Sequence, residues 1–375
     1  MESYPPFHEN YKSLLEKPRR AFYDDHEKRF FCSAASAAYD DDDEEEEELV
    51  DDDKQPPIDL SRLKKKNREE REGCKRQIAE ASSRWGFFQV VNHGVPPRVL
   101  ERMRHHQVQL FHQPFHQKAA GKLLHSASAA AASAQDHHHH NNTNINRYSW
   151  GTPTATCLTN LSWSESFHIP LHDILGSAES DSFRSTVEEF SSAVYRLALR
   201  IAKILAENLG CESNFFAEHC LPSSCYLRLN RYPPCPFPSE VFGIVPHTDS
   251  DFLTVLHQDQ IGGLQLLKDE KWFNLKPNPE ALTINIGDLF QAWSNDVYKS
   301  VEHRAKTNQE VERFSTAFFM CPAYDAIIES CSATTTTAST GPSLYKKFSF
   351  GQYRQQVQDD VKATGNKIGL SRFRL

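Results

Sequence analysis

The feature that most constrains this fold is a series of short apolar segments between residues 223 and 320. Each is rich in β-branched and aromatic residues and is bounded by Gly, Pro, Asn or Asp, as is typical of β-strands. The stretches between them are too short for the helical crossovers that join parallel strands. We therefore expect an antiparallel barrel or jelly roll. The expected strands are residues 226–232, 243–249, 252–258, 263–268, 271–277, 281–287, 300–307 and 313–320.

Helical periodicity is clearest in Phe183–Leu209, where apolar residues recur every three or four positions. Asp181 or Ser182 can cap the start of this helix, and Gly210 can end it. One long amphipathic helix of this kind is expected to pack against the sheet. The remaining expected elements are helices at residues 61–83, 97–111, 114–124 and 348–365 and strands at residues 85–91 and 159–170. The fold class is therefore α+β with a mainly β core and flanking helices.

Composition shifts divide the chain into five parts. The low-complexity insert at residues 126–146 contains four consecutive histidines, but no partner ligands lie at fixed spacing, which favours a flexible loop over a metal site. The parts are a disordered acidic N-terminal arm (1–54), an N-terminal region that contains the insert (55–170), a backing-helix region (171–220), the jelly-roll core (221–325) and a C-terminal loop and helix (326–375).

The net charge of −8 describes the acidic arm rather than the folded body. Asp40–Glu48 and Asp51–Asp53 together carry twelve negative charges, so the rest of the chain sums to +4. A body with so small a net charge does not indicate a protein that binds nucleic acid or a membrane surface.

Cysteine usage and hydropathy indicate an intracellular protein. The nine cysteines are odd in number and scattered, so we expect reduced thiols. No window approaches the roughly 20 apolar residues of a membrane span, and the N-terminus lacks the layout of a signal peptide. We expect a cytoplasmic location. A nuclear one is possible through Lys64-Lys65-Lys66, although a charged helix face is the preferred explanation of these lysines.

The expected strand at residues 243–249 carries a pair of potential metal ligands. His247 and Asp249 are two residues apart, so both side chains point to the same face of an extended chain. A third ligand must come from another strand, and His303 is the best candidate. Two histidines and one carboxylate form the facial triad of non-haem Fe(II) oxygenases, which leaves three coordination positions open. A zinc site is the chief chemical competitor.

Arg313 and Ser315 decide between these metals. A turn near residues 308–310 is expected to fold the following strand back, placing Arg313 opposite His303. A buried guanidinium is costly unless it meets an anion, and a carboxylate fits its planar fork. This pair predicts a small carboxylated ligand beside the metal, which favours Fe(II) with a dicarboxylic co-substrate over zinc hydrolysis. Tyr232 and Asn230 share one face of a nearby strand and can add further contacts.

The joint pattern resembles the plant 2-oxoglutarate-dependent Fe(II) dioxygenases. It consists of Tyr226–Cys235 (YLRLNRYPPC), His247-Thr248-Asp249, His303 and Arg313-Phe314-Ser315, and WGFFQVVNHGV matches the N-terminal region of that family. The resemblance covers residues 56 to about 355. It implies a double-stranded β-helix, Fe(II) held by His247, Asp249 and His303, and 2-oxoglutarate held by Tyr232, Arg313, Ser315 and Asn230.

Within that family, Trp150–Leu171 resembles the gibberellin 2-beta-dioxygenases, specifically the class that acts on C20 gibberellins. This implies that O2 and 2-oxoglutarate drive 2β-hydroxylation of a diterpenoid acid, supported by ascorbate, and that the hormone or its precursor is inactivated. Three alternatives stay open: the same chemistry on C19 gibberellins or on another plant metabolite such as a flavonoid, a non-catalytic jelly-roll binding protein, and zinc hydrolysis. The sequence does not predict the oligomeric state.

Overall fold

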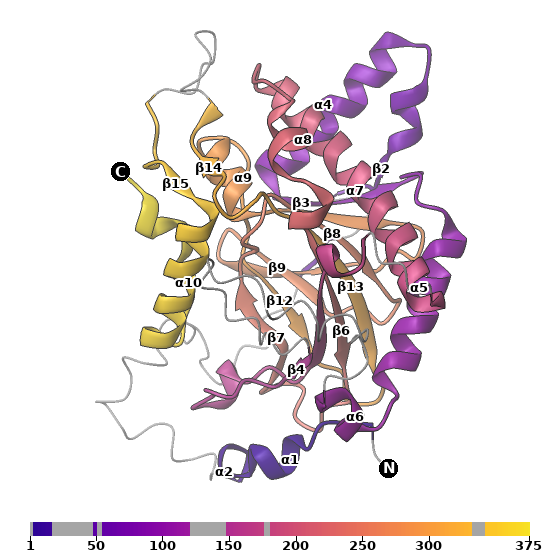
Figure 1. Cartoon of the computed structure of the whole chain (residues 1–375), viewed down its shortest axis with the longest axis vertical. Coiled ribbons are helices and arrows are strands. Elements are labelled where there is room, and N and C mark those ends of the chain that lie inside the picture. The colour runs from indigo at the N-terminus through magenta and orange to yellow at the C-terminus, as the bar shows by residue number, and fades with distance from the viewer. Residues whose placement is uncertain (1–2, 17–47, 51–54, 121–147, 176–180, 332–341) are drawn as a thin grey trace, which may run out of the picture.

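The computed structural model describes residues 3–16, 48–50, 55–120, 148–175, 181–331 and 342–375 (Figure 1). The low-complexity insert and most of the acidic run lie outside these ranges.

Two large sheets form the centre of the fold. The larger has the order β2 (Ile58–Asp59), β3 (Phe87–Val91), β11 (Leu282–Ile286), β8 (Leu253–Gln258), β13 (Arg313–Met320), β6 (Tyr226–Tyr232), β5 (Glu165–Pro170) and β4 (Tyr148–Trp150). The smaller has the order β1 (Glu48–Val50), β10 (Lys271–Leu275), β9 (Leu264–Lys268), β12 (His303–Lys306) and β7 (Phe242–His247). A separate pair joins β14 (Ile327–Ile328) to β15 (Phe348–Ser349). Neighbouring strands are antiparallel, apart from β1 with β10 and β2 with β3.

From β6 onward the chain moves repeatedly between the two sheets. β6, β8, β11 and β13 belong to the larger sheet, whereas β7, β9, β10 and β12 belong to the smaller. This is the expected jelly roll, and the prediction of a mainly β core with flanking helices is confirmed.

The expected hairpin between the last two core strands is wrong. β12 pairs with β7 and β9, whereas β13 pairs with β6 and β8. The connection at residues 307–312 therefore crosses from one sheet to the other. Arg313 lies opposite Tyr232 rather than opposite His303. The crossing is favourable because β13 then fills the gap between two strands of the larger sheet, where both of its edges are hydrogen-bonded.

Helices cover one face of the larger sheet, on the right and at the top of Figure 1. α7 contacts β8 and β13, and it also packs against α4 and α5. The described helices are α1 (Phe7–Asn10), α2 (Lys12–Leu15), α4 (Arg68–Arg84), α5 (Pro97–Phe111), α6 (Phe115–Ala119), α7 (Ser182–Asn208), α8 (Phe215–His219), α9 (Asp288–Trp293) and α10 (Phe350–Thr364). Short 3-10 turns occur at Leu60–Lys64, Leu158–Asn160, Leu171–Asp173, Pro222–Ser224 and Gly369–Phe373.

The long helix α7 forms where its periodicity predicts. The Asp181 side chain caps its start by accepting from the Arg184 N–H at 2.7 Å. Gly210 has a φ of +71°, a left-handed conformation that favours glycine after a helix end. Its apolar stripe, which includes the fully buried Val187, Phe190 and Val194, belongs to the main core. α7 is therefore the expected backing helix of the larger sheet.

The expected loose N-terminal arm is wrong for residues 3–16. These residues form α1 and α2, which pack in a second apolar cluster beside the main core. The Phe7 ring stacks on Trp163 at a centroid distance of 4.4 Å, and Tyr11 is also buried. Aromatic burial therefore orders a segment that has no sustained apolar period.

Two smaller expectations also need correction. The helix expected at residues 61–83 is split, because the Asn67 side chain accepts from the Glu69 N–H and starts α4 after a separate 3-10 turn. Cys211 and Cys331 form a disulfide, so the expectation of reduced thiols is wrong for this pair. Cys32 lies outside the described residues, and the other cysteines are buried thiols that form no disulfide in the described part of the chain.

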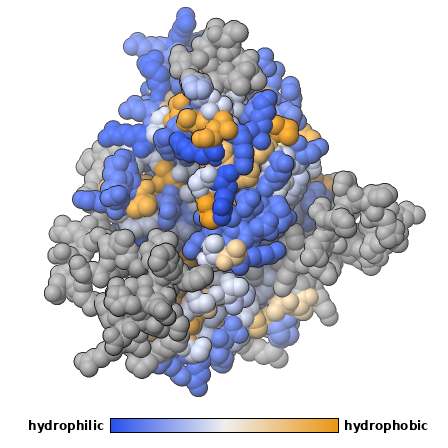
Figure 2. All heavy atoms as spheres, turned by 90° about the vertical axis from the view of Figure 1, so that its left-hand side faces the viewer, coloured by the Kyte–Doolittle hydropathy of each residue, from blue (hydrophilic) through white to orange (hydrophobic). Residues whose placement is uncertain are grey.

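Figure 2 shows the face that carries α10 and the C-terminus. Hydrophilic residues cover most of its coloured surface, and apolar side chains gather in its upper half. Among the described residues, no helix combines the length and apolar character needed to cross a membrane.

Candidate active site

The three expected metal ligands meet at one end of the smaller sheet. His247 ends β7 and His303 begins β12, and the two residues are direct partners in the antiparallel ladder. Asp249 follows β7 by two residues, and its Oδ1 lies 3.9 Å from His247 Nε2 and 3.8 Å from His303 Nε2. One ligand atom from each residue lies within 4.8 Å of the others. The structure therefore brings together the triplet that the sequence predicted.

Backbone carbonyls orient both imidazoles toward the centre of this triplet. His247 Nδ1 donates to the Val245 carbonyl at 2.9 Å, and His303 Nδ1 donates to the Val301 carbonyl at 3.1 Å. A carbonyl only accepts, so Nδ1 carries the proton and each Nε2 keeps a lone pair for a metal. Burial and the neighbouring His303 lower the pKa of His247 to about 3. His247 is therefore a neutral ligand at physiological pH.

Two buried side chains hold the carboxylate. Thr254 on β8 donates to Asp249 Oδ2 at 2.7 Å, and Asn285 on β11 donates to the same atom at 3.1 Å. Burial alone raises the pKa of Asp249, but the two imidazoles and these hydrogen bonds outweigh it and lower the pKa. Oδ1 is left facing the histidines. Neither residue was predicted from the sequence, although the alternation of side chains along each strand places both toward the interior.

Two imidazole Nε2 atoms and one carboxylate are a donor set that fits Fe(II). The three donor atoms lie within 4.8 Å of one another, close enough to bind a single ion. The donor set by itself is also compatible with zinc.

The second predicted group lies on the interior face of the larger sheet. Arg313 faces Tyr232 and Ser315 faces Asn230 in the register of β13 with β6. Asn230 Nδ2 donates to Ser315 Oγ at 3.2 Å, and the Tyr232 hydroxyl lies 3.4 Å from the same oxygen. The Arg313 guanidinium lies over the Tyr232 ring, 4.6 Å from its centroid. All four predicted co-substrate residues are therefore adjacent.

The Arg313 guanidinium is buried with part of its hydrogen-bonding capacity unused. The residue is 3% exposed, and its Nη2 donates to Gln258 Oε1 at 2.8 Å. Its Nε and Nη1 have no hydrogen-bond partner among the described residues, and the same holds for Asn230 Oδ1 and Gln258 Nε2. A buried cation with unused donors favours an anion, and a carboxylate can bind at Nε or at Nη1, in each case together with the second hydrogen of Nη2. These orphaned donors match the far carboxylate of 2-oxoglutarate.

The metal triplet and the Arg313 group line the same interior. Thr254, which contacts Asp249, and Gln258, which contacts Arg313, lie four residues apart on β8 and therefore point to the same face. Four residues of strand span about 13 Å. The long side chain of Arg313 shortens this gap, so one small dicarboxylate can contact both groups.

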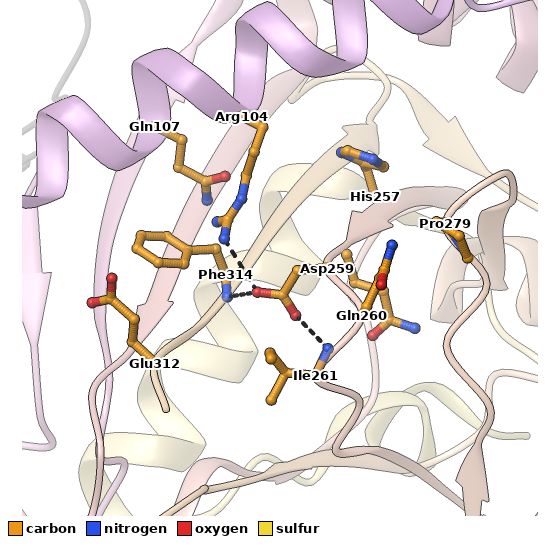
Figure 3. Close-up of a pocket in the computed structure, with 10 residues that line it drawn as sticks. Arg104, Gln107, His257, Asp259, Gln260, Ile261, Pro279, Glu312 and Phe314 are labelled. Carbon is orange, nitrogen blue, oxygen red and sulfur yellow. Dashed lines mark hydrogen bonds and ion pairs between the residues drawn. The ribbon is translucent and has the colours of Figure 1, made fainter. Parts of the chain in front are cut away.

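Helix α5 supports the Arg313 group from the outer face of the sheet. Gln107 donates to the backbone carbonyls of Asn230 (3.1 Å) and Ser315 (2.8 Å). Nearby, a cavity of about 410 Å³ opens between α5 and the ends of β8 and β13 (Figure 3). There Arg104 pairs with Asp259 at 3.4 Å, and Asp259 Oδ2 accepts from the Phe314 N–H at 2.6 Å. This cavity lies behind the strand that carries Arg313, and its polar contacts fix the start of β13.

We expect Thr254→Val to weaken metal binding, because Asp249 then loses a hydrogen bond that orients it. Loss of such supporting contacts typically costs about 10- to 100-fold in metal affinity. The measurement is a Co(II) titration of metal-free protein. Thr283→Val is the matched control, because Thr283 is equally buried and no hydrogen bond joins it to Asp249. Equal affinity in both variants contradicts the role assigned to Thr254.

Comparison with known proteins agrees with this geometry. The 2OG-Fe(II) oxygenase superfamily matches residues 223–322, and the N-terminal region named for non-haem dioxygenase in morphine synthesis matches residues 56–185. The chain is 53% identical over 318 residues to gibberellin 2-beta-dioxygenase 8 of Arabidopsis thaliana, covering 85% of this chain and 86% of that protein. It is 45% identical over 329 residues to gibberellin 2-beta-dioxygenase 6 of Oryza sativa subsp. japonica, covering 85% and 84%.

Solved structures of similar proteins carry the same fold. The crystal structure of JOX2 in complex with 2OG, Fe and JA has a TM-score of 0.63 and 31% identity, covering 80% of this chain and 84% of that one. The rice dioxygenase for auxin oxidation has a TM-score of 0.66 over 86% of this chain and 100% of its own, and at 24% identity it supports the fold alone. The expected family, enzyme class and cofactors are confirmed. The chain belongs to the 2OG-Fe(II) oxygenase superfamily, as a relative of the gibberellin 2-beta-dioxygenases.

Proposed function

We propose that this enzyme 2β-hydroxylates gibberellins, with C20 gibberellins as its substrates. The observation that carries the chemistry is the buried Arg313, whose two orphaned donors lie in the same interior as a two-histidine, one-carboxylate triplet. The substrate is supported by relatives named gibberellin 2-beta-dioxygenases, at up to 53% identity across 85% of the chain. The resemblance of Trp150–Leu171 to the C20 class supports the finer choice.

The proposed roles divide between the two groups of residues. His247, Asp249 and His303 hold Fe(II), while Arg313, Ser315, Tyr232 and Asn230 hold the far carboxylate of 2-oxoglutarate. When bound, iron supplies the oxidation in which one O2 oxygen goes into succinate, with release of CO2, and the other becomes the substrate hydroxyl. The chain binds and orients both reactants and excludes water. No acid–base pair of the protein is required. Ascorbate is expected to support turnover.

The interior face of β6 offers a contact for the substrate's own carboxylate. Arg228 lies two residues from Asn230 and therefore points to the same face. It lies between Ala317 of β13 and His168 of β5 in the ladder, one step from the co-substrate residues. Arg228 is partly exposed, and none of the ion pairs found among the described residues includes it. A diterpenoid acid offers the anion that such a cation prefers.

Product analysis tests the proposed substrate. The purified protein is incubated with Fe(II), 2-oxoglutarate and ascorbate, and with a C20 or a C19 gibberellin in parallel. We expect a 2β-hydroxylated C20 product and one succinate per product. Preference for the C19 compound overturns the subclass, and failure on both overturns the gibberellin assignment in favour of another metabolite such as a flavonoid. If no succinate forms with any of the tested substrates, a non-catalytic binding protein is favoured. If activity depends on added zinc rather than on iron, hydrolysis is favoured.

Substitutions of Arg313 and Arg228 are expected to affect the binding of different reactants. Arg313→Gln should weaken the binding of 2-oxoglutarate by about 2–5 kcal/mol, because a buried charged contact is lost. The same variant should leave gibberellin binding nearly unchanged. Arg228→Gln should raise KM for the gibberellin and leave KM for 2-oxoglutarate unchanged. Each variant is the control for the other. If Arg313→Gln keeps its 2-oxoglutarate dependence, or if Arg228→Gln affects both reactants equally, the corresponding role is wrong.

A further inference from the structure

A lysine from the C-terminal segment contacts the loop that carries Asp249. α10 ends at Thr364 and is capped by Gly365, whose φ of +76° is the left-handed conformation that often follows a helix end. The next turn places the Lys367 ammonium 2.8 Å from the Thr248 carbonyl, 2.8 Å from Ser250 Oγ and 2.6 Å from Asp288 Oδ2. An ammonium has three donors, and all three are used. They bind on both sides of Asp249.

Asp288 connects this lysine to the metal ligand itself. Its carboxylate also accepts from the Thr248 hydroxyl at 3.1 Å and from the Tyr353 hydroxyl of α10. Its backbone N–H donates to the Asp249 carbonyl at 2.9 Å. The Asp288 side chain is 4% exposed and that of Lys367 is 15% exposed. Lys367 is the ion-pair partner of Asp288 in the described part of the chain.

These contacts form a closed arrangement around one peptide segment. Thr248 is held through both its carbonyl and its hydroxyl, Ser250 through its hydroxyl and Asp249 through its carbonyl. These contacts hold the backbone on either side of Asp249, while Thr254 and Asn285 hold its side chain with Oδ1 toward the histidines. A buried ion pair broken on one side is strongly destabilising, so the arrangement depends on both charges.

We propose that Lys367 is a positioning residue for the metal centre. Its ammonium, together with Asp288, fixes the backbone around Asp249 so that Oδ1 stays within reach of both imidazoles. The inference rests on the proposed ligands His247, Asp249 and His303. It goes beyond them because Lys367 touches none of their side chains and comes from the far C-terminal end of the chain.

The competing explanation is that Lys367 only anchors the C-terminal segment. The chain offers a matched control for this. Arg372 pairs with Asp360 of α10 at 3.0 Å and holds the same segment, but Asp360 lies outside the metal loop. Arg372→Gln therefore loosens the segment without removing a contact to Thr248 or Ser250.

The experiment measures Co(II) binding to the metal-free full-length protein, with the dissociation constant and the d–d absorption bands as readouts. We expect Lys367→Met to weaken Co(II) binding by about 10- to 100-fold and to change the bands. We expect Arg372→Gln to lower the melting temperature without changing affinity or bands. Wild-type affinity and bands in Lys367→Met overturn the proposal, as does an equal loss of affinity in Arg372→Gln.

A double variant separates positioning from folding. Lys367→Met leaves the Asp288 carboxylate buried without its counter-charge, and adding Asp288→Asn removes that charge. We expect the double variant to regain thermal stability while Co(II) binding stays weak. Recovery of wild-type Co(II) affinity overturns the proposal. If the wild-type protein and His247→Ala bind Co(II) equally, the proposed ligand set fails, an outcome distinct from failure at Lys367 alone.

Discussion

The site depends on one physical constraint, namely that a buried guanidinium requires an anion. Arg313 is almost fully buried, yet only its Nη2 is hydrogen-bonded by the described residues. Such a group lowers the stability of the folded protein unless a ligand supplies an anion that pairs with it. A carboxylate does so with two parallel hydrogen bonds. The metal triplet alone is compatible with several metals. The carboxylate that Arg313 requires in the same interior favours iron with 2-oxoglutarate over the other metals.

The jelly roll meets this constraint by placing the two groups on different sheets. His247 and His303 come from neighbouring strands of the smaller sheet, while Arg313 and its partners come from the larger one. Because the chain alternates between sheets, residues close in sequence line opposite walls of one interior. Side chains on β8 connect the walls, with Thr254 at the metal and Gln258 at the guanidinium. Helix α5 closes the outer side and fixes the strand backbones.

The sequence predicted the parts of the site that follow from local periodicity. Arg313 and Ser315 share a face because strand side chains alternate. The same rule predicted that His247 and Asp249 converge, and they do, although β7 ends at His247 and Asp249 lies in the loop that follows. Contacts between distant segments were not accessible in this way. The hairpin placing Arg313 opposite His303 was wrong because strand pairing across two sheets is not encoded locally. Thr254, Asn285 and Lys367 reach the site only after folding. The N-terminal arm was misjudged because its few aromatic residues show no period.

An anaerobic crystal structure with Fe(II) and 2-oxoglutarate tests the central claim most directly. The account predicts iron bound by His247, Asp249 and His303, with one end of 2-oxoglutarate on the metal. It predicts the far carboxylate on the orphaned donors of Arg313, beside Ser315 and Tyr232. A metal bound elsewhere, or a 2-oxoglutarate whose far carboxylate leaves Arg313 without an anion, would contradict it.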